Sequence, residues 1–595
     1  MTSSFLKITK INGLRAFSRR RDASDLVLKN GHRSKHSYLY GASIDPLRPY
    51  TIGRIFNDAV RQNPDQKYLV SRHENKTYTY ATIDSEVDKL CRSFNAIGLK
   101  RGERIGVWMP NCALYVSLVL AASRLGLIFV NINPAYQSDE LKHSLTLVGV
   151  KCLVALETFK TQNYPEIIER IDQDIWKRPP NSPVKSKVLP FLETVVFNSE
   201  NRINGAYNLE SFLDLGSNRN YDVPNIQPDE GCNIQFTSGT TGKPKATLLN
   251  HFGMVNNINF IMKRLGIHEN GNLNTFCCMP PLFHTFGLSI GILGTLITKS
   301  TLYFPSAHFE PKAAVDVIIQ DKCTFIFGTP TVLVDVIAAF EKLPPEQRNN
   351  KVKYAMTGGA PCSPVLIKKF KKTFPGTKLV SVFGMTETSP ITFQNYHDDT
   401  DEQIMSTVGQ IHDHVEAKVV DLNGEMVPFG TPGELLIRGY VNMIGYYNDE
   451  EKTKETIDST KWLKTGDQFM LYENGYGNVV GRTKDMIIRG GENIFPVDIE
   501  YFLESHPLIT QVQVYGVPDE RMGEEVCASV IVKEGSTLTE TDIKSYCKGK
   551  ISHFKVPKYV FIEKGEFPKT GSGKVQKFLL KEIAIKRIAK YNEHY

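Results

Sequence analysis

Apolar and polar positions follow two alternating patterns along the chain. Short β-branched runs, at residues 152–155, 234–236 and 325–327, alternate with longer stretches whose apolar residues recur at helical intervals. Strands that alternate with helices are typical of α/β proteins with largely parallel sheets. We therefore expect an α/β fold whose large N-terminal domain contains stacked, mostly parallel sheets with helices.

The pattern changes near Gly430, where short strands and turns follow one another in segments such as residues 433–439. This spacing predicts a small antiparallel subdomain. The segment 481–485 then leads into a final stretch with its own strand and helix patterns, which is long enough for a separate domain. We expect an N-terminal domain over residues 45–483 and a small, mobile α+β C-terminal domain over residues 484–595.

Composition and hydropathy exclude several classes of protein. With 41% hydrophobic and 23% charged residues, the chain is globular rather than disordered or collagen-like. The longest apolar stretch, residues 113–130, contains Arg124, so no uninterrupted run of roughly 20 apolar residues predicts a transmembrane segment. The ten cysteines include no Cys-x-x-Cys pair, and we expect small buried hydrophobes rather than a zinc site or disulfides.

The formal charge of +7 is concentrated at the N-terminus. Residues 1–37 contain nine Lys or Arg and two Asp, so this segment sums to +7 and the rest of the chain to zero. The segment has no acidic residue before Asp22 and interleaves apolar residues with cations, which is typical of a mitochondrial transit peptide. An ordinary basic tail is the alternative. We expect a protein of the mitochondrial matrix and no nucleic-acid partner.

A loop rich in Gly, Thr and Lys follows the predicted strand at residues 234–236 and precedes a helix that begins near Asn250. Its residues are Thr237, Ser238, Gly239, Thr240, Thr241, Gly242, Lys243, Pro244 and Lys245. Glycines let backbone N–H groups approach an anion, hydroxyls donate hydrogen bonds and lysines supply charge. Thr237 and Pro244 do not match a Walker A motif. The loop predicts a phosphate site of another kind, with a polar surface loop as the alternative.

Residues 287–291 match the Gly-x-Ser-x-Gly pattern of hydrolase nucleophiles. That pattern belongs on a sharp turn between a strand and a helix, whereas here it lies in the apolar run 288–297. Glycines recur in this run at positions 287, 291 and 294. We therefore expect close helix packing and no nucleophilic role for Ser289.

Five further motifs occur in order along the chain. They are residues 279–284 (MPPLFH), 383–388 (FGMTET), 465–467 (TGD), 481–493 and 568–574 (PKTGSGK). Together with the phosphate loop they resemble the adenylate-forming superfamily of acyl-CoA synthetases, luciferases and peptide-synthetase adenylation domains. Within that superfamily the chain looks most like the mitochondrial acyl-CoA synthetases that take medium-chain fatty acids.

The resemblance implies a reaction in two steps, with ATP, Mg²⁺ and CoA. A carboxylic acid and ATP form an acyl-adenylate and pyrophosphate, and CoA then takes the acyl group. By similarity, the loop of residues 237–245 holds the phosphates and the leaving pyrophosphate. Glu387 holds Mg²⁺ and Thr386 lies near the α-phosphate. The adenine pocket is lined by Gly358, Gly359 and Ala360.

The resemblance also implies roles for three charged side chains. Asp467 accepts hydrogen bonds from the ribose hydroxyls, and Arg482 reaches ribose or phosphate oxygens. Lys574 bridges the incoming carboxylate and the α-phosphate during adenylation. The chain departs from the family pattern with Ala246 in place of Gly, Asp498 in place of Glu, and Gln576-Lys577 where members often have Arg. None of these departures removes a catalytic group.

Members of this superfamily rotate their C-terminal domain after adenylation. Here Lys484 occupies the hinge position, and the rotation presents the face of Gly490 and Gly491 to the thiol. His284 lies near the acyl and thiol tunnel by similarity, as a gate or positioning group, with a buried packing histidine as the alternative.

Apolar residues at 283–288, together with Met356 and Met385, are expected to line an aliphatic tunnel, since each buried CH₂ contributes roughly 0.8 kcal/mol. We therefore expect a fatty acid:CoA ligase that uses small-molecule substrates. Alternatives are an aryl or other acid:CoA ligase, a luciferase-like oxygenase, an adenylation enzyme that loads another protein, and a catalytically inactive nucleotide-binding scaffold. The oligomeric state stays open.

Overall fold

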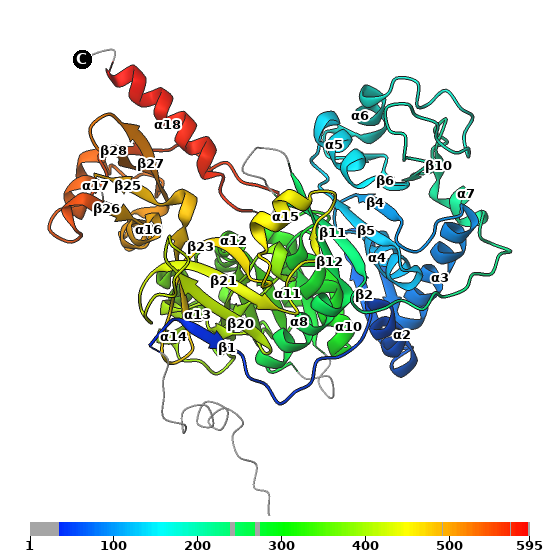
Figure 1. Cartoon of the computed structure of the whole chain (residues 1–595), viewed down its shortest axis with the longest axis horizontal. Helices are drawn as coiled ribbons and strands as arrows, with labels where there is room; N and C mark the ends of the chain where they lie inside the picture. The colour runs from blue at the N-terminus through cyan, green and yellow to red at the C-terminus, as the bar shows by residue number, and fades with distance from the viewer. Residues whose placement is uncertain (1–34, 238–243, 268–273, 491, 572, 593–595) are drawn as a thin grey trace, which may run out of the picture.

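The computed structural model describes residues 35–237, 244–267, 274–490, 492–571 and 573–592. The expected transit peptide lies almost entirely outside these ranges. A small C-terminal unit, residues 487–592, stands at one end of a much larger N-terminal part (Figure 1).

One lobe of the N-terminal part contains an eight-stranded sheet. In spatial order its strands are β10 (Tyr207–Asn208), β9 (Thr194–Asn198), β6 (Cys152–Leu156), β4 (Arg104–Trp108), β5 (Ile128–Ile132), β11 (Gly231–Thr237), β12 (Lys245–Asn250) and β22 (Gly445–Tyr446). The pairs from β10 to β11 are parallel, whereas β12 pairs antiparallel with both of its neighbours.

A nine-stranded sheet forms the second lobe. Its strands are β19 (Gln410–Ile411), β18 (Phe393–Gln394), β17 (Lys378–Phe383), β16 (Tyr354–Gly358), β15 (Phe325–Gly328), β13 (Thr275–Cys278), β14 (Thr301–Phe304), β2 (Lys67–Ser71) and β3 (Lys76–Thr79). The pairs from β17 to β2 are parallel, and the outer pairs are antiparallel.

The largest apolar core joins one side of each sheet to a shared set of helices. These helices are α2 (Ile52–Gln62), α3 (Tyr80–Ala96), α4 (Ala113–Leu125), α7 (Leu209–Asp214), α8 (His251–Arg264), α9 (Thr285–Gly287), the π-helix η1 (Leu288–Leu293) and α10 (Gly294–Thr298). The opposite sides are covered by α5 (Ser138–Val148) and α6 (Tyr164–Ile171) on one sheet, and by α11 (Pro311–Gln320), α12 (Pro330–Glu341), α13 (Pro364–Thr373) and α14 (Asp401–Ser406) on the other.

The continuous apolar runs in the sequence follow from this burial on both faces. Along β5, Phe129 packs in the core between the sheets, whereas Ile128 and Val130 pack on the outer side with α5 and α6. A strand covered on both faces needs apolar residues at every position rather than at alternate ones.

Two smaller sheets complete the described structure. The antiparallel one contains β1 (Tyr38–Tyr40), β20 (Val415–Val420), β21 (Gly433–Gly439), β23 (Leu463–Leu471) and β24 (Gly477–Arg482), with α15 (Glu450–Thr456) between β22 and β23 in sequence. The C-terminal unit contains β25 (Ile487–Arg489), β26 (Glu492–Ile494), β27 (Ile509–Asp519), β28 (Gly523–Val532) and β29 (Tyr559–Ile562), with α16 (Pro496–Glu504), α17 (Glu540–Cys547) and α18 (Lys577–Asn592).

The expected α/β class, the stacked, mostly parallel sheets and the small antiparallel sheet are confirmed. The helix expected near Asn250 is confirmed, since α8 begins at His251, but strand β12 over residues 245–250 was not expected. This short polar-flanked segment gains its extended form by pairing with β11 and β22, which are distant partners that no local pattern reveals.

The apolar run after His284 is helical, as expected. Ser289 lies fully buried inside η1. A Cβ placed on Gly294 would lie 2.8 Å from Met262 Cε, so the glycines of this run do allow close packing. All ten cysteines are free, and nine of them are buried. No helix in the described ranges is both long and apolar enough to cross a bilayer.

Candidate active site

Lys574 lies where a loop of the C-terminal unit meets the N-terminal part. A Cβ placed on Gly359 would lie 3.8 Å from Lys574 Nζ, and one placed on Gly571 would lie 3.1 Å from Phe283 Cζ. Within the loop, Gly573 N–H donates to the Thr570 carbonyl oxygen at 2.9 Å. Small residues on both sides therefore allow the loop to approach the segment of residues 358–360 closely.

Asp467 and Arg482 face each other across neighbouring strands. They are register partners on β23 and β24, and Arg482 Nε donates to Asp467 Oδ1 at 3.1 Å. The Asp467 side chain is buried, with 4% of the residue exposed. Burial raises the pKa of Asp467, while Arg482 and then Lys574 oppose that shift. The pair and Lys574 therefore belong to one electrostatic centre.

The same side chains shift the pKa of Lys574. Burial lowers the pKa of Lys574, and the neighbouring Arg482 lowers it further. Asp467 and Glu387 act in the opposite direction. Four predicted side chains from distant motifs are thus brought within electrostatic reach of one another.

Glu387 lies in a 3₁₀ turn, Thr386–Thr388, after β17. Only 6% of Glu387 is exposed, and its Oε1 accepts hydrogen bonds from the Tyr446 hydroxyl at 2.9 Å and the Thr237 hydroxyl at 3.4 Å. Its backbone carbonyl oxygen accepts from Met443 N–H at 2.8 Å. The carboxylate is held from both β11 and β22 and still has a second oxygen for a ligand.

Lys245 lies opposite Thr237 in the β11–β12 pairing. Its Nζ lies 4.8 Å from the centroid of the Tyr446 ring. Burial lowers the pKa of Lys245, Lys452 lowers it further, and Glu387 raises it. The two described ends of the phosphate loop therefore border the Glu387 cluster. Residues 238–243, which include Ser238, Gly239, Thr240, Thr241, Gly242 and Lys243, lie outside the described residues, and Pro244 precedes β12.

Gly358 is the last residue of β16, and Gly359 and Ala360 follow it before α13. A Cβ on Gly358 would overlap Val382, so a side chain there would push β17 away. Gly359 has a φ of 81°, which favours glycine. The structure thus explains the two glycines by a close approach and by a left-handed backbone conformation.

His284 directly precedes α9, makes no side-chain hydrogen bond to its first turn, and lies close to the ring of Phe283, with centroids 4.6 Å apart. Burial lowers the pKa of His284 to about 3, and the nearby Lys574 contributes to this shift. The imidazole is therefore neutral at physiological pH.

The predicted hinge and thiol-side residues lie apart from these contacts. Lys484 is exposed in the 3₁₀ turn Thr483–Asp485 between β24 and β25. Gly490 directly follows β25, and its N–H donates to the Met522 carbonyl oxygen at 2.8 Å within the C-terminal unit. Gly491 lies outside the described residues.

Comparison with known proteins identifies this arrangement. A family model described as AMP-binding enzyme matches residues 56–447, and one described as AMP-binding enzyme C-terminal domain matches residues 498–574. The chain belongs to the AMP-binding enzyme family.

Relatives with curated names match over nearly the full chain. The medium-chain acyl-CoA ligase ACSF2, mitochondrial, of Bos taurus is 40% identical over 92% of this chain and 89% of its own length. The protein of the same name from Danio rerio is 39% identical over 93% of this chain and 91% of its own length.

Solved structures share the fold. ATP-bound MatB from Rhodopseudomonas palustris superposes with a TM-score of 0.77 at 24% identity, covering 90% of this chain and 99% of its own. The anthranilate CoA ligase AuaEII with anthranoyl-AMP reaches a TM-score of 0.78 at 23% identity, covering 92% and 99%.

Two residues near the site of this AMP-binding enzyme, Tyr446 and Thr329, were not predicted from the sequence. Tyr446, which bonds Glu387, lies outside every motif used above and becomes a neighbour only through the pairing of β12 with β22. Thr329 is buried, and its hydroxyl has no hydrogen-bond partner in the described residues. A Cβ placed on Gly573 would lie 3.4 Å from the Thr329 hydroxyl oxygen. Thr329 directly precedes the proline that begins α12, but Glu310 and Ser363 precede such prolines too, so no sequence signal singles out Thr329.

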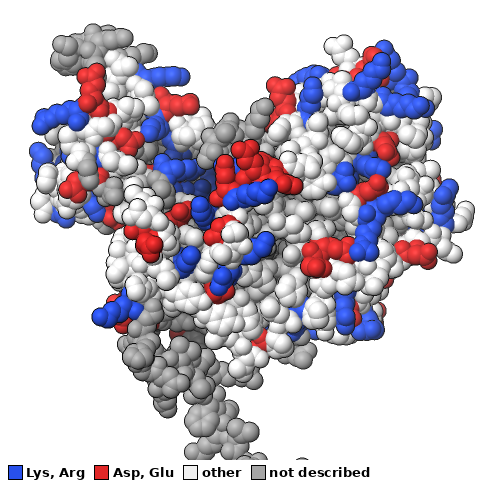
Figure 2. Space-filling model, viewed as in Figure 1, with Lys and Arg blue, Asp and Glu red and all other residues white. Residues whose placement is uncertain are grey.

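A deep notch separates the C-terminal unit from the lobe that carries α5 and α6 (Figure 2). Acidic side chains gather over α15 on this face (Figure 2). Asp449, which caps α15, and Lys452 both act on the pKa of Lys245, so this helix lies beside the end of the phosphate loop.

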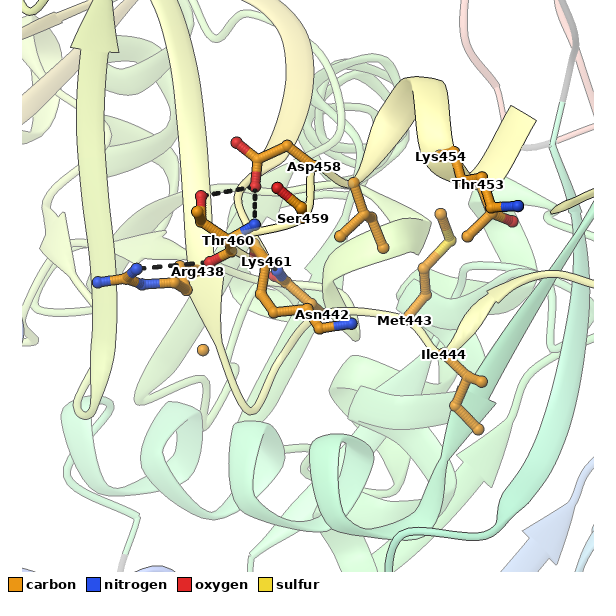
Figure 3. Close-up of a pocket in the computed structure, with 12 residues that line it drawn as sticks. Arg438, Asn442, Met443, Ile444, Thr453, Lys454, Asp458, Ser459, Thr460 and Lys461 are labelled. Carbon is orange, nitrogen blue, oxygen red and sulfur yellow. Dashed lines mark hydrogen bonds between the residues drawn. The ribbon is translucent and has the colours of Figure 1, made fainter. Parts of the chain in front are cut away.

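A groove of about 940 Å³ lies between the segment that precedes β22 and the segment that follows α15 (Figure 3). It is bordered by Asn442, Met443 and Ile444 on one side and by residues 457–461 on the other. None of the predicted site residues lines it. The groove is therefore distinct from the cluster around Glu387 and Lys574.

Proposed function

We propose that this protein is an ATP-dependent fatty acid:CoA ligase that takes medium-chain acids, uses Mg²⁺ and works in the mitochondrial matrix. The observation that carries the proposal is the position of Lys574. Its ammonium group lies beside Gly359 and within electrostatic reach of Asp467, Arg482 and Glu387. A lysine ammonium group in this position can neutralise the charge of a carboxylate and of a phosphate, which suits the activation of a carboxylate by ATP.

The first step joins two anions, so positioning and charge neutralisation limit its rate. A carboxylate oxygen attacks the α-phosphorus of ATP, and the bond to the bridging oxygen of pyrophosphate breaks. Lys574 would hold the attacking carboxylate against the α-phosphate. Asp467 would accept hydrogen bonds from the two ribose hydroxyls, and Arg482 would hold ribose or phosphate oxygens. His284, which is neutral, would act as a gate or positioning group and not as a base.

The carboxylate of Glu387 fits a magnesium ion. Mg²⁺ prefers hard oxygen ligands and often uses one or two carboxylates together with substrate phosphates. Glu387 is buried and oriented by Tyr446 and Thr237, which leaves one oxygen without a hydrogen bond from those residues. The ion would neutralise phosphate charge next to the described ends of the phosphate loop. Thr386, in the same turn, would lie near the α-phosphate.

The second step requires a different arrangement of the C-terminal unit. The thiol of CoA attacks the acyl carbon, AMP leaves, and the thiol proton is lost to solvent. In the present orientation Lys574 lies beside Gly359, where the adenylate would bind. We infer that the unit turns about Lys484 between the steps and brings the face of Gly490 and Gly491 to the thiol, as lid motions do in other multistep enzymes. We accordingly propose that the boundary between the two domains lies between residues 483 and 484.

The substrate class and the location rest on the named relatives. Those relatives are named as mitochondrial medium-chain acyl-CoA ligases and match over nine-tenths of this chain. Of the residues expected to line an aliphatic tunnel, Met356 and Leu288 belong to one core cluster, and Phe286 and Met385 pack against it. The basic leader at residues 1–37 agrees with import into the matrix.

The proposal is tested with protein lacking residues 1–37, ATP, Mg²⁺ and CoA, and acids of increasing length from acetate to palmitate. Pyrophosphate and acyl-CoA are both measured. We expect a clear optimum among medium-chain acids, and Lys574→Ala is expected to slow adenylation at least about a hundred-fold. Highest catalytic efficiency with acetate or an aryl acid would refute the substrate class. Pyrophosphate without acyl-CoA would indicate another acceptor, and no activity with any acid would favour an inactive nucleotide-binding protein.

A further inference from the structure

The C-terminal unit contacts the N-terminal part at a second place, apart from the Lys574 loop. The hydroxyl of Tyr501, on α16, donates a hydrogen bond to the backbone carbonyl oxygen of Cys362 at 3.3 Å. Cys362 lies in the short connection between β16 and α13, two residues after Ala360. This bond therefore joins the C-terminal unit to the nucleotide segment of the N-terminal part.

Glu504 lies three residues after Tyr501 and faces the same connection. Residues three apart share one side of a helix. Burial raises the pKa of Glu504 to about 7, hydrogen bonding by Ser363 opposes the shift, and Glu500 adds to it. Because Ser363 belongs to the N-terminal part, the carboxyl of Glu504 is buried by the contact between the two parts. Away from that contact it would be hydrated and would ionise at its ordinary pKa.

The two ends of one short segment are therefore held by different elements of the C-terminal unit. Lys574 lies beside Gly359, and Tyr501 bonds to Cys362, three residues further along. Any rotation that withdraws α16 from Cys362 also moves Lys574, since both belong to the same unit. The position of Lys574 depends on whether α16 is docked.

We propose that Tyr501 and Glu504 form a latch, which docks α16 on residues 361–363 and holds the C-terminal unit in the orientation that serves adenylation. Both are positioning residues, because they touch no reacting atom and act through the location of Lys574. The latch rests on the proposed function, in which the unit leaves this orientation before the thioester forms. It must open for the second step, so it favours the first half-reaction alone.

The test separates the two half-reactions in the full enzyme. Adenylation is followed as exchange of pyrophosphate into ATP without CoA, and thioester formation as conversion of isolated acyl-adenylate and CoA. Tyr501→Phe keeps the ring and removes the hydroxyl. We expect exchange to slow about two- to ten-fold, which corresponds to one ordinary hydrogen bond. Thioester formation is expected to be unchanged or faster.

Tyr546→Phe is the matched control. The Tyr546 hydroxyl contacts Ser505 Oγ at 3.1 Å within the C-terminal unit. This substitution removes a hydroxyl from the same unit without touching residues 361–363, and both half-reactions should keep their wild-type rates. Thermal unfolding of both variants checks that the fold is intact.

Glu504→Gln gives a second readout that a merely structural role would not change. The charged group that acts on Glu504 from α16 is Glu500, which pairs with Lys577, while Cys362 across the contact carries a neutral thiol. Docking favours the neutral carboxyl of Glu504. The rate of pyrophosphate exchange by the wild type, divided by that of the Gln variant, should therefore fall about ten-fold between pH 6 and pH 8 and stay constant above pH 8.

Three outcomes decide the matter. Slower exchange with preserved thioester formation in Tyr501→Phe supports the latch. Equal effects on both half-reactions, or none, overturn it while leaving the proposed function intact. If the wild-type enzyme catalyses no pyrophosphate exchange with any of the acids tested, the proposed function is wrong, and the latch is wrong with it.

Discussion

The substitution Tyr446→Phe tests whether one hydrogen bond holds Glu387 in its working position. The Tyr446 hydroxyl donates to Glu387 Oε1 at 2.9 Å in a buried environment. Phenylalanine keeps the ring and with it the contact to Lys245, whose Nζ lies 4.8 Å from the ring centroid. The substitution therefore removes one hydrogen bond and leaves the packing in place.

The size of the effect follows from the charge of the acceptor. A hydrogen bond to a charged group contributes about 1.5–3 kcal/mol, and about 1.4 kcal/mol corresponds to a factor of ten in rate. The remaining bond from Thr237 is long, at 3.4 Å, and compensates little. We expect adenylation at subsaturating Mg²⁺ to fall about ten-fold or more. The deficit should narrow as Mg²⁺ rises, because the ion orients the same carboxylate.

The assay is pyrophosphate exchange over a range of Mg²⁺ concentrations. Tyr447→Phe is the matched control, since this neighbouring tyrosine has its ring near Arg104, with 5.9 Å between the guanidinium carbon and the ring centroid. Its rate and Mg²⁺ dependence should stay at the wild-type level. Wild-type Mg²⁺ dependence in Tyr446→Phe would refute the role given to this hydrogen bond and weaken the assignment of Glu387 to the metal.

Three further predictions concern the backbone, the core and the response to acid. In pyrophosphate exchange, Gly359→Ala should slow adenylation more than Gly376→Ala. The two glycines have similar φ values of 81° and 79°, but an added Cβ would contact Lys574 only at Gly359. Equal effects of the two substitutions would mean that backbone strain alone slows the reaction. Arg264→Met should lower the free energy of unfolding by about 3–5 kcal/mol in urea titrations, because buried Arg264 pairs with half-buried Asp413 and donates to the Gln410 and Ile411 carbonyl oxygens. Lys263→Met at the surface should change the free energy of unfolding by less than about 1 kcal/mol. Burial lowers the pKa of His251 to about 4, so the unfolded chain binds more protons than the native one between about pH 4 and 6.5. The free energy of unfolding should therefore fall as the pH drops through that range, and His251→Gln should flatten the slope.

Much of the site was predictable because short motifs carry their own chemistry. Glycines, hydroxyls and lysines between Thr237 and Lys245 indicate a phosphate loop wherever the segment lies in the fold. The alternation of strand and helix patterns likewise predicts stacked parallel sheets, because each strand must be buried on both faces. Close glycine packing after His284 was also visible, since the spacing of small residues is a local property.

Contacts between distant segments were decided by the tertiary structure. Tyr446 reaches Glu387 only because β12, an unexpected strand, pairs with β22 almost two hundred residues later. Tyr501 reaches Cys362 only because α16 docks on the N-terminal part. The sequence determines the chemistry of each side chain and favours a local backbone conformation. Which group a tyrosine hydroxyl bonds to depends on which distant segments pack against each other in the folded chain.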